Sequence, residues 1–215
     1  MKAFSFSSSK TLLPLAWASA FAVGLGLPYP LPAGAAEGGG LLGAPLGDAE
    51  KHADLFTFFN LEETGTTAGA AGARVVSFKP SGPNFRSLVT INVTVDKAGA
   101  ITQIEALIAR SFIEDKTNGV FARDLAKSLL RAGVAAADQE AITDLTNEIE
   151  YPPSTDRLVL SARPAPKLPA QPSAGCLAFL GKQKEFEQAL SATRLRLENR
   201  QAGGDKVLAL TVARR

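Results

Sequence analysis

The sequence has few of the side chains that carry metal and nucleophilic chemistry, with one histidine, His52, and one cysteine, Cys176, among its 215 residues. A zinc site made from histidine and cysteine needs three or four such ligands, so a single chain cannot form one. A Ser-His-Asp or Cys-His catalytic site would have to use His52. No G-x-S-x-G sequence, Walker loop or G-x-G-x-x-G following a predicted strand accompanies it. We therefore expect no metal, no cofactor and a role other than catalysis.

The single cysteine also excludes a disulfide within the chain. Once the N-terminal segment described below is removed, about 180 residues remain, which is enough to build one core without such a bond. We interpret Cys176 as a small buried hydrophobic residue, and the alternative is a thiol that links two chains. Aromatic platforms for bases or sugars are scarce, because Trp17 and Tyr29 lie in that N-terminal segment, which leaves Tyr151 and the phenylalanines.

Residues 1–36 have the pattern of a signal peptide. Lys2 and Lys10 precede an uncharged apolar run over residues 12–27, and small residues around Ala35 follow three prolines. The prolines would end a helix near residue 27. We expect cleavage after residue 35 or 36, export to a bacterial periplasm or the cell exterior, and no stable membrane insertion afterwards. The alternative is that the run is retained as a membrane anchor.

Removal of this segment changes the charge balance. The whole chain has 23 basic and 21 acidic residues, and Lys2 and Lys10 leave without any acid, so 21 of each sign remain. A neutral chain has no general attraction to nucleic acid or to anionic lipid. We therefore expect no nucleic-acid partner.

We expect residues 37–73 to be a flexible N-terminal segment and residues 74–215 to form a single domain. Within the first, residues 38–47 are glycine-rich, residues 48–61 fit a short helix, and residues 62–73 read as a loop of small and polar residues. The apolar residues of the short helix are too close together to be left in water: Leu55, Phe56, Phe58 and Phe59.

Alternation of apolar and polar residues predicts an α+β fold with an antiparallel β-sheet of about five strands. In residues 88–95, valine and isoleucine occupy alternate positions, which is typical of a half-buried strand. Residues 101–113 read as its return strand, so we expect a hairpin. Further strands are expected at residues 74–79, 157–163, 193–198 and 206–212, with a second hairpin at the last two, a proline-rich surface loop over 164–175 and a short helix over 182–191.

Two central helices should pack on one face of this sheet. The first ends at Gly133, and its predicted sheet-facing side carries apolar residues at four-residue spacing: Phe121, Leu125 and Leu129. The opposite side carries a basic row: Arg123, Lys127 and Arg131. This row is either a binding face or, as is more common, the solvated side of the helix.

The second helix is expected over residues 138–150, with Asp138 as its N-terminal cap. Its predicted apolar side consists of Ile142, Leu145 and Ile149. Its other side is acidic, so the two helices can form ion pairs if they pack antiparallel, each worth about 0–1 kcal/mol.

The junction between the return strand and the first helix is the one candidate binding site. Arg110 ends the strand, Asp115 and Asn118 precede the helix, and Arg123 follows one turn in. Helix N-termini and arginines attract anions, so these four residues predict binding of a small anionic ligand or an acidic partner. In the alternative, Arg110 pairs with Glu114 or Asp115, and Asn118 caps the helix.

These observations favour an exported, non-enzymatic binding or scaffolding module of the cell envelope, whose partner is an unknown protein or a small anionic ligand. The alternative is a carboxylate-dependent hydrolase, because two acids at a suitable separation are enough for such chemistry. The 21 acidic residues always permit it, and no pair is singled out by sequence. No motif in the chain identifies a family.

Overall fold

The computed structural model describes residues 40–151 and 171–215, which form an α+β fold around one antiparallel sheet. Its seven strands are β1 Leu61–Ala68, β2 Arg74–Pro80, β3 Val89–Val95, β4 Ile101–Ala109, β5 Glu185–Ala189, β6 Thr193–Ala202 and β7 Asp205–Arg214. They lie in the order β1-β2-β3-β4-β7-β6-β5. The fold class is therefore confirmed, and the predicted number of about five strands is too low. The strand and most of the loop expected over 157–175 lie outside the described residues.

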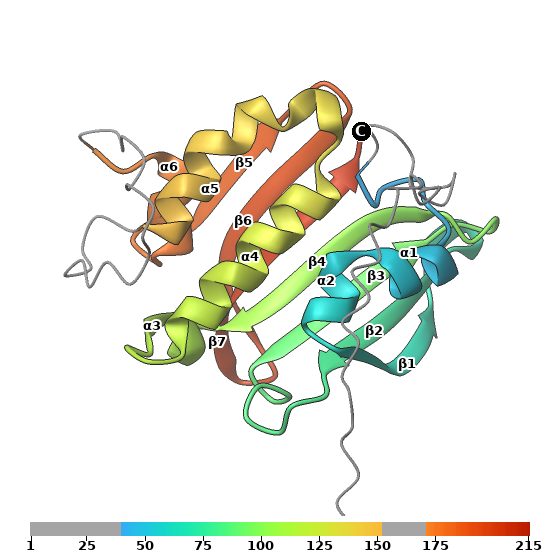
Figure 1. Ribbon diagram of the computed structural model, residues 1–215, viewed down its shortest axis with the longest axis horizontal. Helices are drawn as coiled ribbons and strands as arrows, with labels where there is room; N and C mark the ends of the chain where they lie inside the picture. Colours follow the sequence, from blue (N-terminus) through green and yellow to red (C-terminus); the bar gives the residue numbers. More distant parts are fainter. Residues whose placement is uncertain (1–39, 152–170) are drawn as a thin grey trace, which may run out of the picture. The chain divides into compact units, whose positions relative to one another are not determined.

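Six α-helices accompany the described sheet, where two central helices were expected. They are α1 Leu46–His52, α2 Asp54–Phe58, α3 Arg110–Glu114, α4 Gly119–Gly133, α5 Thr143–Glu150 and α6 Ala174–Phe179. Short 3-10 turns also occur: η1 Ala70–Gly72, η2 Ala136–Asp138 and η3 Glu140–Ile142. Figure 1 shows α4 and α5 on the same face of the sheet as α1 and α2. The expected placement on one face therefore holds for the two central helices, α4 and α5.

The two predicted hairpins form because their apolar residues share one face. In β3, the side chains of Val89, Ile91, Val93 and Val95 are fully or almost fully buried, while the intervening polar side chains are half-buried. Ile91 pairs with Ala106 of β4 across the first hairpin, and Leu197 of β6 pairs with Leu210 of β7 across the second. The helices cover this apolar face, which is the core of the protein.

Strands β1 and β5 were not predicted. β1 falls in the expected loop of residues 62–73, and all but the first of its residues are exposed, so it carries no alternation of apolar and polar residues. β5 falls in the expected helix of residues 182–191. Its Glu185 and Glu187 instead form ion pairs with Arg196 and Arg194 of the neighbouring β6. Both strands are edges of the sheet, where the sequence pattern is weakest.

The described part of the glycine-rich segment is hydrogen-bonded to the rest of the fold, and its flexibility stays a prediction. The Leu41 N–H donates to the carbonyl of Ala132 at the end of α4, and Gly43 donates to Ile101. A Cβ on Gly40 would lie 2.7 Å from the carbonyl oxygens of Ala132 and Val134, so only glycine fits there without a shift. The helix expected over residues 48–61 is divided into α1 and α2 by the extended backbone of residue 53.

Helix α4 packs on the sheet through small residues as well as leucines. Its buried positions are Gly119, Ala122, Leu125, Ala126, Leu129, Leu130 and Gly133. A Cβ on Gly133 would lie 3.1 Å from Val212 of β7, so the end of the helix approaches the sheet closely. The expectation that Phe121 faces the sheet is wrong, because its side chain is 45% exposed. The buried face of the helix is centred on Ala122 and Ala126 instead, and Phe121 lies at its margin.

The face of the sheet opposite the core is polar. Ser77 donates to Asn92, Asn92 donates to Glu105, and Arg200 donates to Glu105 over 2.7 Å. These bonds link side chains from β2 to β6 across the open face. An antiparallel sheet commonly exposes such a face to water.

Candidate functional site

Arg110 is buried at the start of α3, with 8% of the residue exposed. Its guanidinium donates to the carbonyl of Phe179 over 2.6 Å, to the amide oxygen of Asn199 over 3.4 Å, and to the Glu114 carboxylate. It therefore joins α3 to the end of α6 and to β6. The alternative in which Arg110 pairs with Glu114 agrees with this geometry.

Asp115 occupies N–H groups that an anion would need. Its Oδ1 accepts from the N–H of Thr117 over 2.9 Å and from that of Asn118 over 2.6 Å, and its carbonyl accepts from Gly119. These bonds, with that of Asn118 the largest cause, hold the pKa of the Asp115 carboxyl below its usual value. The Asn118 side chain forms no capping hydrogen bond, so the expected cap is wrong.

Arg123 extends back toward the start of α4. A Cβ built on Gly119 would lie 3.5 Å from its Nη1 atom. Arg123 is half-buried, and burial lowers the pKa of its guanidinium, while the charge of Asp124 acts in the opposite direction. The structure thus brings Arg123 to the predicted junction. Binding of an anion by Arg110, Asp115, Asn118 and Arg123 stays a prediction.

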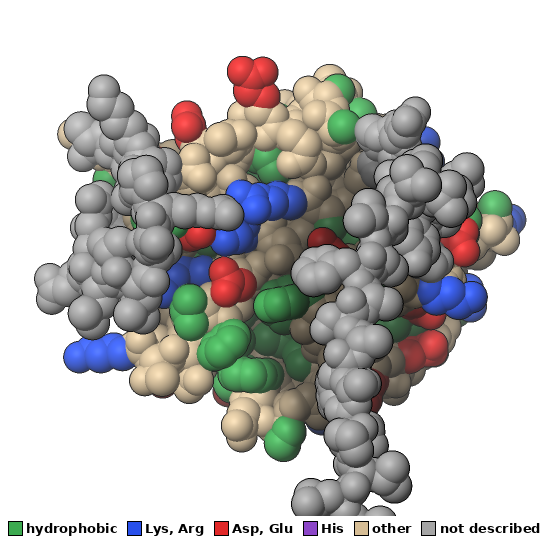
Figure 2. Space-filling model, viewed as in Figure 1, with side chains coloured by type: hydrophobic (Ala, Val, Ile, Leu, Met, Phe, Trp, Pro, Cys, Tyr) green, Lys and Arg blue, Asp and Glu red, His purple; other side chains and the backbone are tan. Residues whose placement is uncertain are grey.

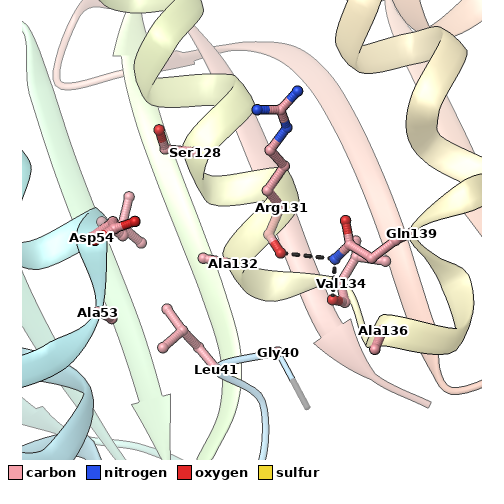
Figure 3. Close-up of a pocket in the computed structure, with 11 residues that line it drawn as sticks. Gly40, Leu41, Ala53, Asp54, Ser128, Arg131, Ala132, Val134, Ala136 and Gln139 are labelled. Atoms are coloured by element: carbon pink, nitrogen blue, oxygen red, sulfur yellow. Dashed lines mark hydrogen bonds between the residues drawn. The ribbon is translucent and has the colours of Figure 1, made fainter. Parts of the chain in front are cut away.

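A groove that sequence reasoning missed separates α2 from α4. One part of it is a cavity of about 480 Å³, bordered by Gly40 and Leu41, by Asp54 at the start of α2, and by Ser128 and Arg131 of α4. Figure 3 shows Asp54 and Ser128 on opposite walls of this cavity. The lining therefore combines polar side chains with apolar ones such as Leu41 and Leu55.

The second part of the groove is a cavity of about 610 Å³. It is lined by Asp54, Thr57, Phe58, Asp124, Lys127 and Ser128. Because Asp54 and Ser128 line both cavities, the two form one continuous surface feature, which we call the α2–α4 groove. One wall is the short helix α2 and the other is the 15-residue helix α4, and Figure 1 shows both on the same face of the sheet.

Large hydrophobic side chains are exposed in α2 and in the first turn of α4. Among the described residues, Phe58, Val120 and Phe121 are exposed by 72%, 42% and 45%. Phe58 lines the groove from α2, and Phe121 packs on Phe85 with ring centroids 5.3 Å apart. Figure 2 shows hydrophobic side chains gathered between α2 and the N-terminal half of α4. Exposed clusters of this kind mark interaction surfaces more often than isolated exposed residues do.

The basic row of α4 divides into paired and unpaired members. Lys127 lies 3.0 Å from Glu150 and 3.5 Å from Asp124, which confirms that α4 and the acidic side of α5 pair. Arg123 and Arg131 form no ion pair with any carboxylate of residues 40–151 or 171–215. Lys127 and Arg131 both line the α2–α4 groove, so part of the basic row borders a concave surface.

Gln139 lines the groove at the C-terminal end of α4 and binds main-chain carbonyls there. Its side-chain amide donates to the carbonyls of Arg131 over 2.8 Å and Val134 over 2.7 Å, as the dashed lines in Figure 3 show. These carbonyls end α4 and have no partner further along the helix. The C-terminal end of the groove is therefore a fixed surface. Gln139 carried no signal in the sequence, because its partners are main-chain atoms.

Two buried carboxylates lie outside the groove and have structural partners. Asp138 accepts from the N–H of Ser191 and of Ala192 rather than capping α5, which corrects the predicted cap. Glu148 accepts from the N–H and hydroxyl of Ser173, and that hydroxyl accepts from the N–H of Cys176. Asp138 thus binds the turn between β5 and β6, and Glu148 binds the N-terminal cap of α6, both far away in sequence.

Cys176 is fully buried in α6, in agreement with its interpretation as a small hydrophobic residue. Burial is the largest cause that raises the pKa of its thiol to about 11, and the nearby Glu148 charge acts in the same direction. A thiol with this pKa carries almost no thiolate near neutral pH, so it is a poor nucleophile.

No protein-family model, curated protein or solved structure matches this chain. No helix within the described ranges is both long and apolar enough to cross a membrane. In the same part of the chain, no three His, Cys, Asp or Glu side chains are grouped so that they could hold a metal ion.

Proposed function

We propose that the protein is a non-enzymatic binding or scaffolding module, exported to the periplasm or the cell exterior. The observation that carries the binding role is the α2–α4 groove, a concave surface that the exposed Phe58 lines, together with the exposed Phe121 at the start of α4. The signal-peptide pattern of residues 1–36 supports export. The scarcity of histidine and cysteine supports a role other than nucleophilic catalysis.

Affinity capture from envelope extracts tests this function. We expect the protein, expressed from the full chain and tagged at its C-terminus, to begin near Ala36 in a mass spectrum and to retain specific envelope components. The variant with both Phe58→Ser and Phe121→Ser should lose them, since exposed apolar anchors dominate binding.

The matched control is Arg194→Ala, an exposed change on the opposite face of the sheet. It should retain the same components as the unchanged protein. A protein that keeps Met1 in the membrane fraction would contradict export. Absence of any specifically retained component would contradict the binding role.

A carboxylate-dependent hydrolase is the second candidate, and one observation favours it. Asp54 and Asp124 line the same cavity from opposite walls of the groove. Two carboxylates flanking a substrate are the minimum for acid–base hydrolysis of a glycoside. A hydrolytic activity that either Asp54→Asn or Asp124→Asn abolishes would favour this candidate over the binding module.

We also retain the proposal of a small-anion site at the junction of α3 and α4. Arg123→Ala should abolish binding of inorganic phosphate, measured by calorimetry, and change the free energy of unfolding by only a few tenths of a kcal/mol, as surface changes outside the core commonly do. Lys116→Ala is the control, because Lys116 is exposed at the same junction. If the unchanged protein does not bind phosphate, the site does not exist. The N–H groups of Thr117 and Asn118 then serve only as donors to the Asp115 carboxylate.

A further inference from the structure

We propose that Asn118 is a site of spontaneous deamidation, where the folded protein converts this asparagine to aspartate or isoaspartate. The inference goes beyond the proposed binding function and does not rest on it. It follows from the residue after Asn118, from the exposure of its side chain, and from the hydrogen bonds that hold the turn before α4.

The reaction needs only this chain and water. The main-chain nitrogen of Gly119 attacks the Cγ carbon of Asn118, and the new N–C bond closes a five-membered succinimide ring. The Gly119 amide proton goes to the departing side-chain nitrogen, which leaves as ammonia. Water then adds to one of the two ring carbonyls, and the ring opens to aspartate or to isoaspartate. No oxidant, reductant or other co-reactant takes part.

The residue after Asn118 makes this asparagine the most reactive of the six in the chain. A Cβ on the following residue hinders the approach of its nitrogen to Cγ, and only Asn118 is followed by glycine. Glycine also reaches backbone angles that are closed to other residues, so the ring can form more easily. The other five asparagines are followed by larger residues: Asn60 by Leu61, Asn84 by Phe85, Asn92 by Val93, Asn147 by Glu148 and Asn199 by Arg200.

The fold requires glycine at position 119. A Cβ on Gly119 would lie 2.7 Å from the carbonyl oxygen of Ile113, which is closer than real Cβ atoms approach. Helix α4 therefore begins in close contact with the end of α3. The Asn-Gly pair cannot be protected by a larger residue at 119 without a shift of one helix against the other.

The Asn118 side chain is exposed to water and forms no capping hydrogen bond with α4. Its Cγ carbon is therefore open to the reaction and to the water that follows. In contrast, three of the other asparagines donate hydrogen bonds from their side-chain amides to groups elsewhere in the fold: Asn60, Asn92 and Asn199.

The turn before α4 holds the reacting atoms apart. At a ψ of −14°, the Gly119 nitrogen is nearly eclipsed with the main-chain nitrogen of Asn118 and turned away from its Cβ. The Gly119 N–H also donates to the Asp115 carbonyl over 2.9 Å. The Asp115 carboxylate accepts from the N–H groups of Thr117 and Asn118. The first turn of α4 must therefore open before the ring closes, and helix ends open more readily than helix centres.

These hydrogen bonds make Asp115 a positioning residue that slows the reaction. Its carboxylate fixes the two N–H groups that precede Gly119, so the peptide between Asn118 and Gly119 rotates only when those bonds break. We expect Asp115→Ala to increase the rate of deamidation about fivefold, as for the loss of one hydrogen bond to a charged group at an exposed position.

Conversion adds one negative charge to the junction of α3 and α4. Aspartate at this position lies at a helix N-terminus, where a carboxylate is favourable. The Nη1 atom of Arg123 also reaches this turn, 3.5 Å from a Cβ built on Gly119. Isoaspartate instead lengthens the main chain by one atom in the first turn of α4, which should loosen it.

Peptide mapping of the purified folded protein, incubated at mildly alkaline pH, tests the proposal. Trypsin cleaves after Lys116 and Arg123, so residues 117–123 form one peptide whose single asparagine is Asn118. We expect this peptide to convert first to the acid form in the mass spectrum, and to separate into aspartate and isoaspartate isomers. The rate should be at least about fivefold lower than in urea, because hydrogen bonds of the turn must open first.

Matched variants separate the chemistry from the fold. Asn118→Ser should abolish the conversion of this peptide, and Asn118→Asp supplies the chromatographic standard for the aspartate product. Glu114→Ala is the control for Asp115→Ala, because Glu114 is an equally exposed acid whose carboxylate binds Arg110 and not the turn. It should leave the rate of deamidation unchanged.

Three results would overturn the inference or part of it. If another asparagine of the folded protein converts first, Asn118 is not the reactive site. If the peptide of residues 117–123 keeps its amide in the folded protein after the chain in urea has converted, the turn does not open and the proposal fails. A rate that Asp115→Ala leaves unchanged overturns the role of Asp115. None of these results bears on the capture of envelope components, which tests the binding function separately.

Discussion

Arg110→Ala should lower the free energy of unfolding by about 3 kcal/mol, the sum expected when hydrogen bonds from a buried charged donor are lost. The guanidinium is the donor to the carbonyl of Phe179, a residue that is fully buried, and to the Asn199 side chain. Alanine leaves that carbonyl without a partner and creates a cavity. Urea unfolding should show a lower midpoint with an unchanged slope.

Glu114→Ala is the matched control, because it removes the exposed partner of the same arginine. The Glu114 side chain is 65% exposed, so its ion pair with Arg110 should contribute less than about 1 kcal/mol. If Arg110→Ala costs no more than Glu114→Ala, then water replaces the guanidinium, and the junction of α3, α6 and β6 does not depend on Arg110.

Gly181 offers an independent check on the same contact. It has a φ of 74°, and a Cβ there would lie 2.7 Å from the Nη2 atom of Arg110. Gly181→Ala therefore costs backbone strain and a clash with Arg110, whereas in the Arg110→Ala background only the strain remains. A double-mutant cycle should show that the two changes cost less together than the sum of their separate effects.

Asp138→Asn should also cost about 3 kcal/mol near pH 7, because a buried donor loses its acceptor. One carboxylate oxygen accepts from the N–H of Ser191 and the other from the N–H of Ala192, and the hydroxyls of Ser191 and Thr193 donate as well. Asparagine has one carbonyl oxygen, so its NH₂ must face one of the two main-chain N–H groups. The turn that joins β5 to β6 would then be weakened.

The cost of Asp138→Asn should depend on pH. The Ser191 hydroxyl is the largest cause that lowers the pKa of the Asp138 carboxyl in the folded protein. Because the folded pKa lies below the unfolded value of about 3.9, the stabilisation is complete above that value and is lost as the pH falls through the folded pKa. The difference between the two proteins in urea unfolding should therefore shrink below about pH 4.

Asp144→Asn serves as the control for the pH dependence. Asp144 is exposed in the first turn of α5, so its replacement should change the free energy of unfolding by less than about 1 kcal/mol. An Asp138→Asn protein whose loss of stability is the same at pH 7 and at pH 3 would show that the charge of Asp138 does not stabilise the turn.

The sequence predicted those parts of the fold whose pattern is set by burial on one face. In β3, every second residue packs in the core, and along η3 and α5 the predicted apolar residues Ile142, Leu145 and Ile149 are all buried. The strands β1 and β5 have no such face, because β1 is exposed and β5 pairs its glutamates with arginines of β6. Their formation depends on neighbouring strands, which a local pattern does not contain.

Local reasoning predicted less of the candidate site. Asp115 and Asn118 lie just before α4 as predicted, but the return strand ends at Ala109, and Arg110 begins α3 instead of ending the strand. The partners of Arg110 come from α6 and β6, far along the chain. The exposure of Phe58 and Phe121 runs against their hydrophobicity, so composition predicts them to be buried. A helical wheel centred on Ala122 and Ala126 would have placed Phe121 beside the core rather than within it.

The position of β7 between β4 and β6 has a consequence for the order of assembly during synthesis. Gln103 of β4 pairs with Ala213 of β7, so the partners lie about 110 residues apart. Among the described strands, the main-chain hydrogen bonds of the sheet join the β1–β4 part to the β5–β6 part only through β7. A nascent chain therefore holds an open, unpaired edge on β4 until residues 205–214 have left the ribosome. During that interval the edge is able to pair with other chains, so a partly synthesised chain is more prone to aggregate than the finished one.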